Sequence, residues 1–112
     1  VEKARPAQAA IRANIADLAA TEVSLVAADA VAFSASPGGA FDVVVADPPY
    51  ALPAVELAGI LAALHAGGRL AADAVIVVER AWRDGPFPFP EGLAADRSRR
   101  YGDTIVCYGH AL

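Results

Sequence analysis

The sequence has no methionine, one cysteine and one tryptophan among its 112 residues. The lone Cys107 excludes a disulfide within the chain, and its place in an apolar alternation predicts a small buried side chain. No apolar run approaches the roughly 18 residues of a membrane-spanning helix, and no basic-then-apolar leader is present. We therefore expect a cytoplasmic protein with no membrane partner. Because the chain opens on Val1 without an initiator, we also expect a fragment of a longer protein.

Charged residues are few and the chain is slightly acidic, with 9 basic and 13 acidic residues and a net charge of -4. This balance argues against a broad basic surface for nucleic acid. Residues 80–103 nevertheless carry one more basic than acidic side chain, through Arg80, Arg83, Arg97, Arg99 and Arg100. Such a basic rim suits a domain that touches phosphates at one edge, and it suits a solvated loop equally well.

What the sequence does have is enough apolar content, 56% of residues, for one hydrophobic core. Helical spacing of apolar residues predicts helices over 4–20 and 53–65. Apolar runs predict buried strands over 22–29, 41–46 and 74–79, with a short helical turn after the first. The proline-rich segment 84–90 must be a loop, and segments 97–101 and 104–110 around Gly102-Asp103 predict a hairpin.

Helices alternating with doubly buried strands indicate an α/β fold. We expect a doubly wound, mostly parallel sheet that closes on the antiparallel hairpin. In such sheets ligands bind outside the carboxyl ends of the strands, where Glu2, Asp29, Asp47 and Glu79 are expected to fall. Acids at these junctions also cap the following helix, so either role is open for each of them.

The tetrapeptide Asp47-Pro48-Pro49-Tyr50 follows a buried strand directly. Its prolines fix the backbone, so the Asp47 carboxylate and the Pro48 carbonyl become two acceptors on a nearly rigid turn. Tyr50 adds a flat aromatic face. Two acceptors beside an aromatic plane suit a flat heterocycle with an exocyclic amino group, which donates both hydrogens while its ring stacks.

This tetrapeptide resembles motif IV of class I S-adenosylmethionine-dependent amino-methyltransferases. The resemblance extends over the whole chain to the 16S ribosomal RNA (guanine-N2)-methyltransferase family. It is carried by Val1-Glu2-Lys3, by Ala28-Asp29, by the tetrapeptide, by Val77-Val78-Glu79-Arg80 and by Tyr101-Gly102-Asp103-Thr104. The partner it implies is 16S ribosomal RNA or a 30S assembly particle.

The resemblance also implies roles for individual residues. Glu2 would receive the two ribose hydroxyls of S-adenosylmethionine, and Asp29 and the Ala30 N–H would bind the adenine, with Lys3 and Val31 bordering the pocket. Asp47, Pro48, Pro49 and Tyr50 would hold the amine that attacks the sulfonium methyl. Positioning the two reactants supplies several kcal/mol, and no metal is required.

The sequence departs from the family pattern in one respect, because no glycine-rich cofactor loop is present. That loop belongs about twenty residues upstream of Glu2. We therefore expect residues 1–112 to be the C-terminal part of a single methyltransferase domain whose first strand is absent from this chain. That strand would lie between the strand ending at Glu2 and the strand ending at Asp47.

Other functions fit the same residues. An adenine-N6 or cytosine-N4 DNA methyltransferase uses the same motif, but usually carries a large target-recognition segment that has no counterpart here. A protein glutamine methyltransferase favours Asn at the position of Asp47. A catalytically silent interaction domain, docking through the loop Pro86 to Pro90, is the alternative from another class.

Overall fold

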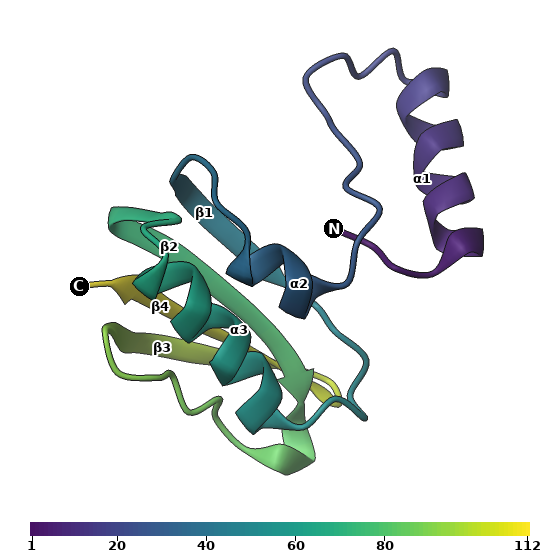
Figure 1. The fold of residues 1–112 in the computed structure, drawn as a ribbon. Helices are drawn as coiled ribbons and strands as arrows, with labels where there is room; N and C mark the ends of the chain where they lie inside the picture. Colours follow the sequence, from purple (N-terminus) through teal and green to yellow (C-terminus); the bar gives the residue numbers. More distant parts are fainter. The chain divides into compact units, whose positions relative to one another are not determined.

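The computed structural model describes residues 1–112, which divide into two units, Val1–Ser36 and Pro37–Leu112. In chain order the elements are α1 (Arg5–Asp17), α2 (Ala30–Ala35), β1 (Phe41–Ala46), α3 (Ala54–Ala66), β2 (Leu70–Ala81), a 3-10 turn (Trp82–Asp84), β3 (Leu93–Tyr101) and β4 (Thr104–Ala111). Figure 1 shows them in colours that follow the sequence.

The first unit contains the expected helix and helical turn, but the strand predicted over 22–29 is wrong. Helix α1 starts with Pro6 in its first turn, where a missing N–H costs nothing, and ends at Asp17 shortly before Ala19 with φ of 48°. The segment after it forms only an isolated parallel bridge between Glu2 and Ala27. One bridge leaves most of its backbone without a ladder, so apolar composition alone does not make it a strand.

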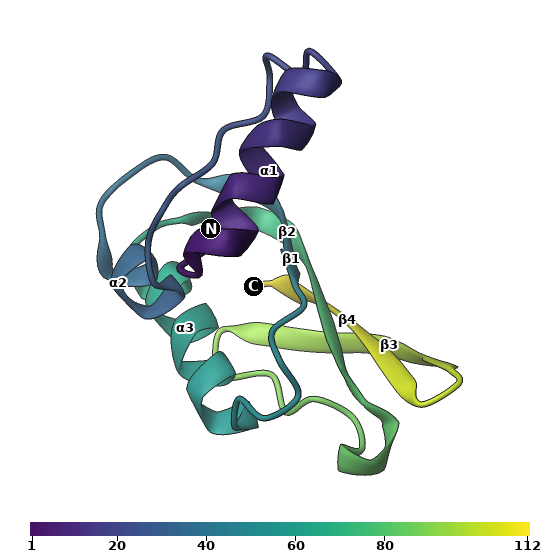
Figure 2. The same cartoon turned by 90° about the vertical axis from the view of Figure 1, so that its right-hand side faces the viewer.

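The second unit is a mixed four-stranded sheet in the order β1-β2-β4-β3. Strands β1 and β2 are parallel, as expected for strands joined through a helix, here α3. The pairs β2–β4 and β3–β4 are antiparallel. The expected hairpin is confirmed, since β3 and β4 run side by side to a tight turn where Gly102 has φ of 60° (Figure 2).

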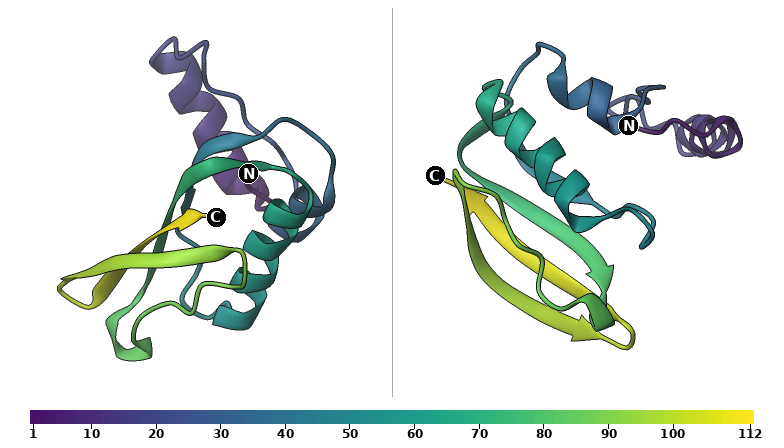
Figure 3. Two further views of the ribbon diagram at one scale, coloured as in Figure 1. Left: turned by 90° about the vertical axis from the view of Figure 1, so that its left-hand side faces the viewer. Right: turned by 60° about the horizontal axis from the view of Figure 1, so that its bottom comes forward.

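One face of this sheet is covered by α3, which lies along it (Figure 3). The buried residues come from both layers: Leu57, Leu61 and Leu64 of α3, Ala74, Ile76 and Val78 of β2, and Ile105 and Cys107 of β4. Phe87 adds to them from the expected proline-rich loop. The prediction that Cys107 is buried is therefore confirmed, at 2% exposure. A second helical layer on the opposite face, which a doubly wound fold requires, remains a prediction.

Two strand predictions need correction. Strand β1 has the expected bounds but is not buried, because Val43 and Val45 lie on the sheet face opposite α3 and are 58% and 70% exposed. Strand β2 is twice as long as predicted, running from Leu70 to Ala81. Glu79 therefore lies inside β2, paired with Val106, and not at its carboxyl end.

Candidate functional site

The turn after β1 begins at Asp47, the first residue beyond the strand. Its side chain is exposed and accepts no hydrogen bond within the chain, so both carboxylate oxygens face solvent as free acceptors. Pro48 and Pro49 follow, and the Leu52 N–H donates to the Pro49 carbonyl at 2.9 Å to close a turn over residues 49–52. The two acceptors predicted from the sequence thus lie between the end of a parallel strand and a hydrogen-bonded turn.

Tyr50 is anchored by its hydroxyl. This group lies 2.6 Å from Oγ1 of Thr104, the first residue of β4, while the residue as a whole is 37% exposed. Thr104 had no predicted role, because the contact joins residues 54 positions apart. The bond holds the tyrosine against the hairpin turn and leaves part of its ring available for stacking.

Arg80 supports the turn from inside the protein. It is 4% exposed, and its Nη2 donates to the Leu52 carbonyl and, at 3.5 Å, to the Tyr50 carbonyl. The second bond is at the outer limit of hydrogen-bond length, so the Leu52 contact is the stronger one. The Nη1 atom is buried without a partner, and no carboxylate forms an ion pair with the guanidinium.

A buried arginine that donates to main-chain carbonyls was not predicted. The available signal was a charged residue inside the apolar run of β2, at a position that pairs with the buried Ile105. Long charged side chains are almost never fully buried unless they are bound to something. Arg80 is therefore a positioning residue for the turn at Asp47, acting through the backbone of residues 50–52.

The residues predicted to bind a cofactor all lie in the first unit, where the structure brings several of them together. The backbone of Glu2 bridges that of the segment before Asp29, with the Ala28 N–H donating to the Glu2 carbonyl at 3.2 Å. Lys3 Nζ lies 3.5 Å from Asp29 Oδ2. Glu2 and Asp29 thus lie close together in the chain's first unit, joined through one backbone bridge and the Lys3–Asp29 ion pair.

Asp29 also has the alternative role that the sequence left open, because it caps helix α2. Its Oδ1 accepts from the Val31 N–H at 2.8 Å. This backbone hydrogen bond, with a smaller contribution from Lys3, lowers the pKa of Asp29 below its ordinary value of 3.8. The carboxylate is exposed and stays charged at neutral pH, so it can cap the helix and accept from a ligand.

The exposed side-chain acceptors of the first unit match the hydroxyl and amino donors of a nucleoside. The Glu2 side chain accepts only the Ala4 N–H, on Oε1 at 2.8 Å, which leaves its other oxygen for a hydroxyl. Val31 is 59% exposed and offers an apolar edge beside Asp29. No cluster of three or more His, Cys, Asp or Glu side chains is arranged to hold a metal ion. None of the helices has both the length and the apolar character needed to cross a membrane.

Solved structures with this fold include three bacterial proteins. The Escherichia coli protein named "Putative methyltransferase yhhF" is 25% identical, with a TM-score of 0.85 over 98% of this chain and 60% of its own. A "conserved hypothetical protein" of Streptococcus pyogenes is 28% identical, with a TM-score of 0.84 over 99% of this chain and 69% of its own. A Haemophilus influenzae protein named "putative methylase HI0767" shares the fold at 22% identity, with a TM-score of 0.80 over 99% of this chain and 70% of its own.

The fold is therefore a methyltransferase-like α/β fold with a mixed four-stranded sheet. Residues 1–110 match the family described as Conserved hypothetical protein 95, and the chain belongs to this family. A search of curated proteins finds no match to the sequence. The chain spans 60% of the length of the Escherichia coli structure.

Proposed function

We propose that the protein containing this chain is an S-adenosylmethionine-dependent methyltransferase that modifies the exocyclic N2 amine of a guanine in 16S ribosomal RNA. The observation that carries the proposal is the Asp47 turn. It places a free carboxylate and the Pro48 carbonyl after a parallel strand, and Arg80 and Thr104 hold it from two sides. The Escherichia coli relative named a methyltransferase supports the class of reaction.

In this proposal the chain acts by orientation. An aromatic amine is a poor nucleophile because its lone pair is delocalised into the ring. The Asp47 carboxylate and the Pro48 carbonyl accept its two hydrogens, which fixes the nitrogen and frees its lone pair for methyl transfer. The Tyr50 ring stacks on the base, and its hydroxyl bond to Thr104 keeps the ring from rotating away. Holding two reactants in this way accelerates transfer without a group of matched pKa.

The cofactor site in this proposal comprises Glu2, Lys3, Asp29, Ala30 and Val31. S-adenosylmethionine supplies an electrophilic methyl group when it is bound. Glu2 accepts from ribose hydroxyls, and Asp29 accepts from the adenine amino group beside the Ala30 N–H. Lys3 neutralises part of the acidic charge through its ion pair with Asp29, and Val31 borders the adenine.

The test is methyl transfer by the full-length protein from labelled S-adenosylmethionine to three substrates: 30S particles, free 16S RNA and DNA of matched length. The expected result is label in RNA or 30S particles that digests to N2-methylguanosine. Label in N6-methyladenine or N4-methylcytosine of DNA would replace the RNA substrate with DNA and retain the chemistry. Absence of cofactor binding and of transfer to any nucleic acid would favour a silent interaction domain.

A further inference from the structure

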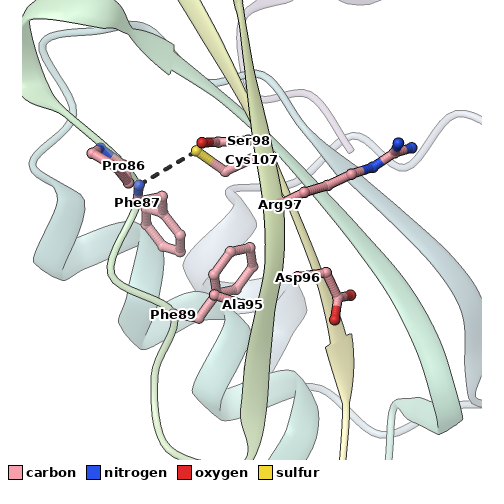
Figure 4. Close-up of a pocket in the computed structure, with 8 residues that line it drawn as sticks. All are labelled: Pro86, Phe87, Phe89, Ala95, Asp96, Arg97, Ser98 and Cys107. Atoms are coloured by element: carbon pink, nitrogen blue, oxygen red, sulfur yellow. Dashed lines mark hydrogen bonds between the residues drawn. The ribbon is translucent and has the colours of Figure 1, made fainter.

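The two faces of strand β3 carry different chemistry. Directly opposite residues of an antiparallel pair point to the same side of the sheet. Arg97 opposite Tyr108, and Tyr101 opposite Thr104, therefore lie on one face, while Ser98 opposite the buried Cys107 lies on the other. Figure 4 shows Arg97 extending away from the side on which Phe87, Phe89 and Cys107 gather.

The first of these faces carries what we name the arginine–tyrosine face, formed by Arg97, Arg99, Tyr101 and Tyr108. The Arg97 guanidinium carbon lies 4.6 Å from the centre of the Tyr108 ring, and that of Arg99 lies 5.3 Å from the centre of the Tyr101 ring. Neither arginine forms an ion pair. These four residues line a hollow of about 170 Å³.

The acid nearest in sequence to these arginines is engaged elsewhere. Both Asp96 oxygens lie within hydrogen-bond distance of His110 Nδ1, at 2.8 and 3.0 Å. No carboxylate thus forms an ion pair with Arg97 or Arg99, and each guanidinium lies over a tyrosine ring that limits its movement. Arginines restrained in this way lose less side-chain entropy on binding a ligand.

The arginine–tyrosine face continues into the turn that carries Asp47. Tyr101 is paired with Thr104, and Thr104 Oγ1 lies 2.6 Å from the Tyr50 hydroxyl. A ligand bound at the Asp47 turn therefore has Tyr101 as its next neighbour beyond Tyr50 and Thr104, with Arg99 two residues further along β3. All of these residues belong to the unit Pro37–Leu112.

We infer that the arginine–tyrosine face binds the single-stranded RNA that flanks the methylated nucleotide, an inference that rests on the proposed function. Arg97 and Arg99 contact phosphates, and neighbouring bases stack on the Tyr101 ring and on the exposed guanidinium planes. An unpaired strand is required because stacking on protein side chains needs bases that are free of a duplex. Two restrained cations on an otherwise acidic protein give local contact with RNA without a broad basic surface.

Arg100 is excluded from this face, although the sequence grouped it with Arg97 and Arg99. It pairs with the buried Ile105, its guanidinium carbon lies 4.4 Å from the Trp82 ring centre, and its Nε donates to the Gly102 carbonyl at 2.7 Å. Arg100 is thus turned to the opposite side of β3 and bound to its own hairpin. It makes a control of equal charge on the same strand.

The experiment measures binding of the full-length protein to a fluorescent single-stranded RNA of 16S sequence, to the same RNA annealed to its complement, and to single-stranded DNA, over a range of salt concentrations. The variants are Arg97→Gln with Arg99→Gln, Arg100→Gln alone, and Tyr101→Leu. Each phosphate contact to a single strand contributes about 0.7 to the slope of log K against log salt, so the double variant should flatten the slope by about 1.4. Tyr101→Leu should weaken single-strand binding about 5- to 150-fold.

Arg100→Gln should bind like the wild type, and the double variant should lose little affinity for the duplex. A slope changed by Arg100→Gln and unchanged by the double variant would overturn the assignment of the face while RNA remains the substrate. Tighter binding of DNA than of RNA, with the same dependence on Arg97 and Arg99, would keep the face and overturn RNA as its ligand. A wild-type protein that transfers methyl groups only to a protein would overturn both the face and the proposed function.

Discussion

Replacing Arg80 with methionine tests whether the turn at Asp47 must be held from inside the protein. The change keeps an unbranched, flexible apolar stem of the side chain and removes the guanidinium that donates to the Leu52 and Tyr50 carbonyls. The lost charge-assisted hydrogen bond to Leu52 costs about 1.5–3 kcal/mol, and the long contact to Tyr50 adds less. Against this, the buried guanidinium has no carboxylate partner and an orphaned Nη1, so its removal relieves a desolvation penalty of several kcal/mol.

Because these terms oppose each other, we expect the free energy of unfolding to change by less than about 2 kcal/mol. Methyl transfer should respond more strongly. A turn that loses its internal support shifts the target amine, and a displacement of about 1 Å can lower the rate about 100-fold. We therefore expect kcat to fall by about two orders of magnitude, with the affinity for S-adenosylmethionine unchanged because the proposed cofactor residues lie in the other unit.

The assay combines urea unfolding, calorimetric titration of the cofactor and single-turnover methyl transfer on one preparation of the full-length protein. Arg83→Met is the matched control, since Arg83 lies on the exposed 3-10 turn three residues further along the chain. Wild-type kcat in Arg80→Met would refute the positioning role. A fall in kcat that accompanies a large loss of stability would refute the expected balance between the lost hydrogen bonds and the relieved desolvation.

Three further predictions concern the turn and the proposed cofactor residues. Tyr50→Phe and Thr104→Val should each reduce methyl transfer mildly, because each variant loses one exposed hydrogen bond of about 0.5–1.5 kcal/mol. Tyr50→Ala should reduce it severely, because the variant also loses the stacking ring. Equal losses of activity in Tyr50→Phe and Tyr50→Ala would contradict stacking. Glu2→Ala should weaken S-adenosylmethionine binding by about 1–3 kcal/mol with kcat less affected, which calorimetry decides. Asp29, whose pKa is lowered by the Val31 N–H, should stabilise the fold above pH 3.8 and lose this contribution as the pH falls through its folded pKa. Thermal unfolding of the wild type and of Asp29→Asn from pH 2 to 6 measures this contribution. A difference in stability between the two proteins that does not change with pH would refute the prediction.

The sequence predicted those elements whose signals are local. Helices α1 and α3 follow from apolar spacing, and the β3–β4 hairpin follows from Gly102, whose positive φ suits a tight turn. The prediction of a strand over 22–29 was wrong because a strand needs neighbours to pair with, and here only one bridge, from Glu2 to Ala27, is available. The prediction that β1 is buried was wrong for a related reason, since composition does not reveal which sheet face is covered.

The residues of the candidate site also divide into those that have a local sequence signal and those that do not. Asp47 to Tyr50 could be identified because four adjacent residues carry the chemical pattern. Thr104 and Arg80 could not, because their contacts with the turn join residues 54 and 28 positions apart and depend on the order of the strands. The separation of Arg97 from Arg100 likewise depends on the register between β3 and β4. A bulge between Ala95 and Arg97 shifts that register, and no sequence signal marks it.

The most direct test of the account is methyl transfer by the full-length protein carrying Asp47→Ala, with Asp42→Ala as the control. Both aspartates are exposed, and Asp42 lies at the start of β1, five residues before the turn. We expect Asp47→Ala to lower transfer by several orders of magnitude with cofactor affinity nearly unchanged, and Asp42→Ala to behave like the wild type. Normal turnover by Asp47→Ala would contradict the claim that the turn after β1 holds the reacting amine.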